Sequence, residues 1–316
     1  MFFSSLESIF SIMLMIALGY ILRRKGVFDE TTGKVFTTLV SNIALPAYMV
    51  WNLTSSFTRE KLLSLEDGLV IPFLSMLASF AIGYVISKAI KIAPCRQGTF
   101  TCMFFVSNTI FIGLPVNLAL FGDQSVPYVL LYYMANTCLF WTIGVYAISR
   151  DGSAERPAFL SFQNIQKTFS PPLLGFLVGV LLVLLEIKLP ASLLDTCKYL
   201  GNLTTPLSML FIGMSIYGVG LHEIKLNKDM IALIFGRFII SPLTVCFIAM
   251  LLPIPLLMKQ VFIIQSAMPV ITQASIISKA YNADHRYAAV MTAVTTVLAI
   301  TAIPIYMTLF QHFPGI

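Results

Sequence analysis

The amino-acid sequence predicts an all-α polytopic membrane protein, and three observations lead to this class. Of the 316 residues, 58% are hydrophobic and only 11% are charged, whereas an average soluble domain has about 25% charged residues. The mean hydropathy is +0.88. The apolar residues gather in long continuous runs, without the alternation of a transmembrane β-barrel. This composition disfavours soluble enzymes, nucleic-acid-binding proteins and disulfide-stabilised secreted modules.

Ten hydrophobic segments are long enough to cross a bilayer, which takes about 20 residues in a helix. They cover residues 5–22, 35–53, 69–90, 98–121, 126–148, 169–187, 199–219, 229–252, 258–280 and 287–310. Basic residues follow the first segment and do not precede it, which is typical of a transmembrane helix and not of a cleavable signal peptide. We therefore expect ten transmembrane helices.

The distribution of basic residues predicts the orientation of these helices. If the N-terminus lies outside, 14 of the 20 Lys and Arg residues fall in inner loops, five fall in outer loops, and Arg237 lies within a span. This bias follows the positive-inside rule. We expect a multi-pass protein of the cell (inner) membrane, with both termini outside the cytoplasm.

A motif shared by the second and seventh spans indicates an internal repeat. Asn42 precedes Pro46 by four residues, Asn202 precedes Pro206 by four, and the two motifs are 160 positions apart. With this offset the other spans also fall onto spans. Each half has an odd number of spans, so the halves must insert in opposite orientations as an inverted repeat. The expected parts are a first repeat at 1–148, a cytoplasmic linker at 149–168 and a second repeat at 169–316.

The fourth and ninth spans, which are equivalent in the two halves, carry the strongest helix breakers. Gly113 and Pro115 lie in the fourth span, and Pro269 lies in the ninth. Broken helices that cross inside the bilayer aim positively polarised N-termini at one point, which favours an anion such as a carboxylate. The two prolines are 154 positions apart and not 160, which predicts either an asymmetric crossover or small insertions that shift it. Asn42 and Asn202 are expected to satisfy backbone groups freed at the kinks of the second and seventh spans.

Charged residues are rare inside the spans. Arg237 is a candidate for substrate binding or gating, and the alternative is that its side chain extends to the membrane interface. Lys279 closes the ninth span, where it serves either as an interfacial anchor or at the cytoplasmic mouth. No Asp or Glu lies in the middle of a span, which disfavours cation exchange. No Cys or His cluster is present, so we expect no metal and no cofactor.

At these motifs the chain resembles the auxin efflux carrier family, which includes plant auxin exporters and bacterial malonate and malate permeases. The matching motifs are Asn108-Thr109 through Gly113-Leu114-Pro115, Gln265-x-Ala267-x-Pro269, Lys279-x-Tyr281-Asn282, and Asn42 to Pro46. The resemblance implies a 5+5 inverted repeat with broken crossover helices 4 and 9. It also implies a scaffold of helices 1, 2, 6 and 7, a transport bundle of helices 3–5 and 8–10, an elevator-type motion, and a homodimer.

The resemblance further implies a substrate site at the crossover. Its expected members are Asn108, Thr109, Gly113, Pro115, Asn117, Asn136, Met268, Pro269, Thr272 and Gln273. The long cytosolic loop of many plant members is absent, which favours the short bacterial type. Plant exporters carry an acidic and a basic residue in the third span, where this chain has only Ser75 and Ser79. Auxin-like acids are therefore the less favoured substrates.

The leading hypothesis is a secondary transporter that moves small organic anions such as malonate or malate by elevator-type alternating access. The coupling ion stays open between H⁺, Na⁺ and none. The alternatives are a Na⁺-coupled organic-anion symporter of the bile-acid-carrier type, a cation/proton exchanger, and a membrane receptor that keeps a transporter fold but moves nothing. An enzyme is not expected, because no His, Asp, Glu or Cys constellation lies within the spans. The expected partners are the substrate and the lipid bilayer, with no nucleic acid.

Overall fold

The computed structural model describes residues 2–63, 66–152, 170–218 and 227–313. Within these ranges the regular structure is helical, and the β-type pairing is a single antiparallel bridge between Ser107 and Val270. The all-α class is thus confirmed. Most of the linker predicted at 149–168 lies outside the described residues.

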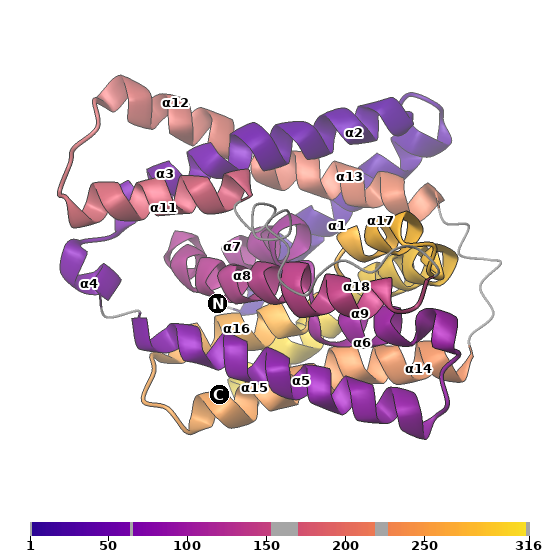
Figure 1. Ribbon diagram of the computed structural model, residues 1–316. Coiled ribbons are helices and arrows are strands. Elements are labelled where there is room, and N and C mark those ends of the chain that lie inside the picture. The colour runs from indigo at the N-terminus through magenta and orange to yellow at the C-terminus, as the bar shows by residue number, and fades with distance from the viewer. Residues whose placement is uncertain (1, 64–65, 153–169, 219–226, 314–316) are drawn as a thin grey trace. The chain divides into compact units, whose positions relative to one another are not determined.

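Every predicted hydrophobic segment contains α-helix in its described part (Figure 1). In the first half the α-helices are α1 (Phe2–Arg24), α2 (Glu30–Leu39), α3 (Leu45–Ser56), α4 (Arg59–Leu63), α5 (Val70–Ala89), α6 (Gln97–Phe105), α7 (Leu114–Phe121), α8 (Val126–Leu139) and α9 (Val145–Ser149). In the second half they are α11 (Pro171–Leu184), α12 (Ala191–Gly201), α13 (Thr204–Gly218), α14 (Lys228–Phe235), α15 (Ser241–Met250), α16 (Leu256–Ser266), α17 (Gln273–Ala280) and α18 (His285–His312). Short 3-10 turns lie at η2 (Glu66–Leu69), η3 (Pro94–Arg96) and η5 (Asp123–Ser125).

Several helices join end to end into continuous rods. Among the described residues, four rods are long and apolar enough to cross a membrane, namely Val70–Ala89, Asp123–Ser149, Lys228–Met250 and His285–His312. These rods support an integral membrane protein, as the composition predicts. The number of ten crossings stays a prediction.

Four π-helical turns directly precede α-helices: η1 (Val40–Ala44), η4 (Thr109–Gly113), η6 (Phe140–Gly144) and η8 (Gly236–Ile240). Three of them directly precede an α-helix whose second residue is proline, namely Pro46, Pro115 and Pro242. Proline lacks the N–H group that an α-helix uses for its i→i−4 bond. A wider turn before the proline shifts the hydrogen-bond pattern by one residue and lets the helix continue.

This arrangement corrects the position of the break in the fourth span. Gly113 has ordinary helical dihedrals, with φ −63° and ψ −45°, and Pro115 lies in the first turn of α7, where proline fits without strain. The interruption lies upstream, where α6 ends at Phe105 and Val106 is extended. The expectation of a break at Gly113 and Pro115 is therefore wrong, whereas Pro269 does lie between two helices.

The chain divides into two compact units. The first unit comprises Met1–Asp67, Ile110–Leu130 and Phe169–Gly218. Within it, α1 packs along α13 and α11 packs along α3. Small residues allow the first of these contacts, because a Cβ atom on Gly213 would lie 2.0 Å from the carbonyl oxygen of Ile16. This is the small-residue packing typical of membrane helices.

The second unit comprises Gly68–Thr109, Leu131–Thr168 and Val219–Ile316. In this unit α6 lies against α5 and α9, α15 contacts α5 and α16, and α17 packs on α18. The buried side chains of α6 and α16 form much of its core, with Phe100, Phe104 and Phe262 fully buried. Both interrupted segments, the one after α6 and the one between α16 and α17, belong to this unit.

Candidate functional site at the helix crossover

Two extended segments meet where the fourth and ninth spans are interrupted. One follows α6 and contains Ser107 and Asn108, and the other follows α16 and contains Pro269 and Val270. The N–H of Asn108 donates to the carbonyl oxygen of Pro269 at 2.8 Å, beside the Ser107–Val270 bridge. The chain thus forms a crossover of two broken helices inside the second unit.

Side chains from two further helices satisfy the backbone groups that the breaks release. The amide of Asn136 on α8 accepts from the N–H of Ser107 and donates to its carbonyl oxygen, both at 3.0 Å. The hydroxyl oxygen of Thr295 on α18 accepts from the N–H of Val270 at 3.1 Å. Away from water, such groups must find partners within the protein. Asn136 and Thr295 therefore fix the two extended segments in place.

Some polar atoms at the crossover have no hydrogen-bond partner. The side-chain N–H of Gln265 donates to the carbonyl oxygen of Thr109 at 3.3 Å, but its Oε1 atom is buried and unpaired. The hydroxyl oxygen of Ser107 is also buried and unpaired. Because buried polar atoms are normally paired, these two atoms provide hydrogen-bonding capacity for a bound molecule or water.

The beginning of α17 completes the part of the site on the ninth span. Met268 is buried, whereas Thr272 and Gln273 are partly exposed. The Thr272 hydroxyl donates to the side-chain oxygen of Gln273 at 3.4 Å, a weak contact that a ligand could replace. These two side chains lie at a helix N-terminus, the end of a helix that favours negative charge.

The other expected site residues on the fourth span belong to the first unit. Gly113, Pro115 and Asn117 are all buried there. Asn117 donates to the carbonyl oxygen of Gly113 at 2.7 Å, one turn back along the helix, and its own Oδ1 atom is buried and unpaired. The structure therefore brings Asn108, Thr109, Asn136, Met268 and Pro269 together in the second unit. Gly113, Pro115 and Asn117 are packed in the first unit.

Arg237 lies in the wide turn η8 and is fully buried. Its Nη1 atom donates to the carbonyl oxygen of Phe104 at 2.9 Å and, more weakly, to that of Met103 at 3.5 Å. Its Nη2 atom donates to the carbonyl oxygen of Ser266. The guanidinium thus binds the C-terminal ends of α6 and α16, and it does not extend to an exposed surface.

The opposite end of α6 carries a negative charge. The carboxylate of Asp151, in the turn after α9, accepts from the N–H groups of Gly98 and Thr99, each at 2.6 Å, and from the Thr99 hydroxyl at 2.8 Å. Burial raises the pKa of Asp151, and these hydrogen bonds oppose the rise. A carboxylate at this position complements the positive N-terminal end of the helix dipole.

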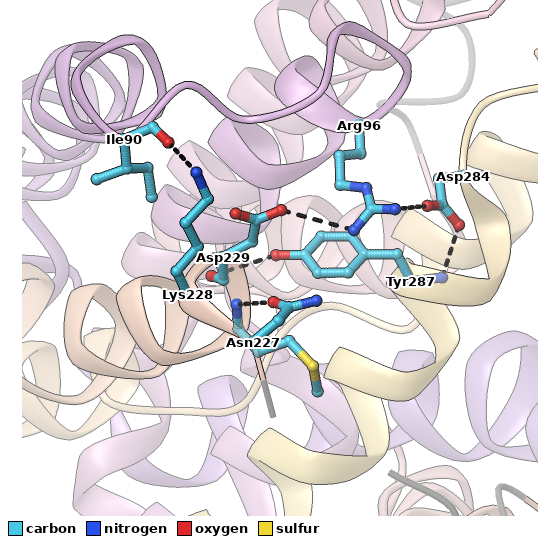
Figure 2. A network of polar contacts seen from close by, with 8 residues as sticks. Ile90, Arg96, Asn227, Lys228, Asp229, Asp284 and Tyr287 are labelled. Carbon is cyan, nitrogen blue, oxygen red and sulfur yellow. Dashed lines mark hydrogen bonds and ion pairs between the residues drawn. The ribbon is translucent and has the colours of Figure 1, made fainter. Parts of the chain in front are cut away.

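A second polar network lies beside that end of α6 (Figure 2). Arg96 pairs with Asp284 at 3.0 Å and with Asp229 at 3.5 Å, and its guanidinium lies 5.2 Å from the ring centre of Tyr287. Lys228 donates to the carbonyl oxygen of Ile90 at 2.7 Å. This network connects the segment before α6 with the starts of α14 and α18.

The remaining expected residues lie at exposed or half-buried positions. Lys279 is exposed near the end of α17, and Asn42 and Asn202 are exposed in or beside helix junctions of the first unit. Pro46 and Pro206 both lie in the first turn of a helix, at the starts of α3 and α13. No group of three or more His, Cys, Asp or Glu side chains that could hold a metal occurs within the described ranges.

Three residues of the crossover are missing from the sequence-based set, namely Ser107, Gln265 and Thr295. Ser107 and Gln265 lie within the two motifs that contain the helix breakers, and their polar side chains beside a break are the signal in the sequence that marks them. Thr295 lies in an ordinary apolar helix next to Thr296, and only the paired threonines set it apart. Its contact with Val270 is a matter of tertiary packing.

Comparison with known proteins matches the chain to membrane transport proteins along nearly its whole length. A family model described as membrane transport protein matches residues 4–307. An uncharacterized transporter of Methanocaldococcus jannaschii is 25% identical over 305 residues, which cover 95% of this chain and 97% of the relative. One from Methanothermobacter thermautotrophicus is 24% identical over 309 residues, with 96% and 98% covered. The uncharacterized transporter YfdV of Escherichia coli K12 is 19% identical over 301 residues, with 94% of each chain covered.

Proposed function

Because the chain belongs to the auxin efflux carrier family of membrane transport proteins, it is a transporter and not an enzyme, and we propose that its cargo is a small organic anion. Dicarboxylates such as malonate and malate are the first candidates. The proposal rests above all on the crossover of two broken helices within one compact unit. In secondary transporters, such discontinuous helices form the substrate site.

The polarity of the crossover favours an anion over a cation as substrate. No Asp or Glu occurs among the crossover residues Val106–Thr109 and Ala267–Gln273, so the site offers no charged ligand for a cation. The hydroxyl of Thr272 and the amide of Gln273 lie at the N-terminus of α17, where the helix dipole attracts negative charge. A carboxylate bound there would accept hydrogen bonds from neutral donors, and Asn108 would contribute from the other segment.

The geometry also supports the inverted repeat. Asn108 and Pro269, whose backbones bond directly, are 161 positions apart. That separation is close to the offset of 160 between the two Asn-Pro motifs, whereas Pro115 and Pro269 are 154 apart. The two breaks thus lie at nearly equivalent positions of the two halves. In the first unit, the α1–α13 and α11–α3 contacts likewise pair the first and sixth spans with the seventh and second.

The second unit is our candidate for the moving part of an elevator. It contains most of the third, fifth, eighth, ninth and tenth spans and the first half of the fourth. The first unit contains the first, second, sixth and seventh spans, which we propose as the scaffold of a homodimer. The segment Ile110–Leu130 groups with the first unit by its contacts, so the division within the fourth span differs from the simple helix-by-helix scheme.

The loop ends of the second unit support the proposed topology. Asp151 contacts the start of α6, and Arg96 contacts the starts of α14 and α18. The chain alternates between sides with each crossing, so the loops after the third, fifth, seventh and ninth spans must share one side. These four loop ends meet at one end of the unit, as ten crossings require, and the excess of basic residues assigns that end to the cytoplasm.

Counterflow in proteoliposomes tests the proposed cargo. Labelled malonate, malate or indole acetate is added outside vesicles that contain an unlabelled pool of the same acid, with and without Na⁺ and a pH step. We expect transient accumulation of a labelled dicarboxylate. If no acid accumulates although the protein binds one in a thermal-shift assay, the protein acts as a receptor. If none binds, the anion assignment is wrong.

Substitution at the crossover tests the site. Asn108→Ala should abolish counterflow while the protein remains folded. Ser215→Ala is the matched control, because Ser215 is exposed on α13 and its hydroxyl donates only to the carbonyl oxygen one turn back, that of Phe211. Normal flux in Asn108→Ala would remove Asn108 from the site.

A further inference from the structure

The guanidinium of Arg237 binds the backbone and no carboxylate. Both ion pairs found in the described part of the chain involve Arg96, and Arg237 takes part in neither. Its partners are carbonyl oxygens of Phe104 and Met103 at the end of α6, and of Ser266 at the end of α16. A fully buried cation with only carbonyl partners is unusual, because buried charges are normally balanced by an opposite charge.

The opposite charge comes from the two half-helices. The C-terminal end of a helix carries roughly half a negative charge, so two such ends together carry about one. α6 ends at Phe105 and α16 ends at Ser266, and one guanidinium contacts the last turns of both. An arginine side chain stays protonated and supplies one positive charge. The two helix ends therefore balance the positive charge of Arg237 without an added ion.

The packing around Arg237 holds the guanidinium in this position. A Cβ atom on Gly236 would lie 2.0 Å from a ring carbon of Phe104, so only glycine lets η8 approach α6 this closely. The Ser241 hydroxyl, one turn further on, donates to the same Phe104 carbonyl at 3.0 Å. The turn η8 and the first residue of α15 thus present one charged and one neutral donor to the end of α6.

In carriers with broken helices, the C-terminal ends of the half-helices and the unwound carbonyls are where coupling cations bind. We propose that Arg237 is a resident cation of the crossover, which occupies the position of a coupling ion at the two half-helix ends, so that the carrier works without Na⁺. Arg237 is then a positioning residue, because it acts on the backbone of the crossover and not on the cargo. The flux measurement below rests on the proposed transport function, whereas the stability measurements do not.

Chemical rescue tests this role in the purified protein. Arg237→Ala removes the cation and leaves a space of its shape. We expect the melting temperature of this variant to fall by about 5–8 °C, the shift that loss of a buried charged group produces in a chain of this length. Millimolar guanidinium should restore part of the loss. Urea, which has nearly the same shape and is neutral, should not.

Two controls separate the charge from the hydrogen bonds. Ser241→Ala removes a neutral donor from the same carbonyl and should show no guanidinium rescue. Arg237→Lys keeps a positive charge, and Arg237→Gln keeps N–H donors without a charge, so the lysine variant should be the more stable of the two. These variants also decide the question if Arg237→Ala does not fold.

The following outcomes would overturn the proposal. Urea could rescue Arg237→Ala as well as guanidinium does, or the glutamine variant could be as stable as the lysine variant. Each would show that the positive charge is not what assembles the crossover.

Flux then tests the ion dependence directly. Counterflow by the wild-type protein should be the same in Na⁺ and in choline, whereas residual counterflow by Arg237→Ala should rise several-fold with guanidinium or Na⁺. Wild-type counterflow that requires Na⁺ would contradict the proposal. Absence of counterflow with every tested acid would instead point to a wrong cargo, and the stability results would still stand.

Discussion

The two ends of α6 carry opposite charges in different surroundings. At the N-terminal end, Asp151 accepts hydrogen bonds from Gly98 and Thr99. At the C-terminal end, Arg237 donates to Phe104 and Met103. Each charge matches the sign that the helix dipole favours. The first lies beside a loop, with other ionisable groups nearby, and the second lies in the apolar interior of the second unit.

This difference shows how one electrostatic rule serves two purposes. Near the loop, burial makes the charge of Asp151 costly, the helix N-terminus recovers only part of that cost, and the pKa of the group rises. In the interior, arginine cannot release its proton, so its charge has to be matched permanently. Two helix ends provide that match at the crossover. We therefore expect the C-terminal end of α6 to be the less tolerant of substitution.

The largest effect should come from the interior charge. Arg237→Ala leaves the carbonyl groups of Phe104 and Ser266 unpaired and creates a cavity, at an expected cost of about 3–5 kcal/mol. Asp151→Ala should cost about 1 kcal/mol, because its partners at the helix N-terminus lie closer to solvent. Reversible unfolding in mixed micelles would measure both. Equal losses would remove the distinction between the two ends.

The extended segment just beyond the C-terminal end should be the next most sensitive. Asn136→Leu leaves both backbone groups of Ser107 without their partner, and we expect a loss of about 2–3 kcal/mol. Asn136→Asp keeps the acceptor for the Ser107 N–H, but its carboxylate would be a buried charge facing the Ser107 carbonyl oxygen, so its loss should be at least as large. Melting temperatures of the two variants would rank them. A leucine variant as stable as wild type would show that another group supports Ser107.

The Arg96 network should respond more weakly, and it should respond to salt. Arg96→Ala removes two ion pairs in which the Arg96 side chain is 26% exposed, so we expect a loss of about 1 kcal/mol at low salt. Salt screens such pairs, and the difference from wild type should shrink in high salt. The loss in Arg237→Ala should stay constant across the same series. A constant loss in Arg96→Ala would place that network in an interior environment too.

The smallest effect should be a pH dependence at Asp151. Because burial raises its pKa, the folded protein binds this proton more tightly than the unfolded chain does. Stability of the wild type relative to Asp151→Asn should therefore fall as the pH rises above about 4. Melting curves of both proteins across pH would show it. A difference that grows with pH would mean that the fold favours the carboxylate after all.

The sequence was sufficient to predict the class of the molecule and the two interrupted spans. Apolar runs and scarce charges leave few alternatives to membrane helices, and Pro269 does lie in a break. The position of the other break could not be read in the same way. Pro115 is a strong breaker in isolation, but a preceding wide turn accommodates it, and the chain opens at Ser107 and Asn108 instead.

The hydrogen-bond partners of the key side chains could not be predicted from the sequence. Arg237 stands out as a buried charge candidate, yet its ligands are carbonyl groups, which every residue has. Thr295 and Asn136 act on segments far away along the chain, and their contacts depend on how α18 and α8 pack. Local patterns identify residues that need partners, and only the tertiary structure shows which partners they find.

The wide turn η8 gives the eighth span one residue more than an uninterrupted α-helix would need for the same path. Deletion of a single residue within Gly236–Ile240 would turn η8 into an ordinary α-helical turn. The helices on both sides would keep their faces, because the wide turn absorbs the extra residue. A deletion within α14 or α15 would instead rotate every side chain beyond it by about 100°. We therefore expect deletion of one residue of η8 other than Arg237 to be tolerated better than a deletion within either neighbouring helix.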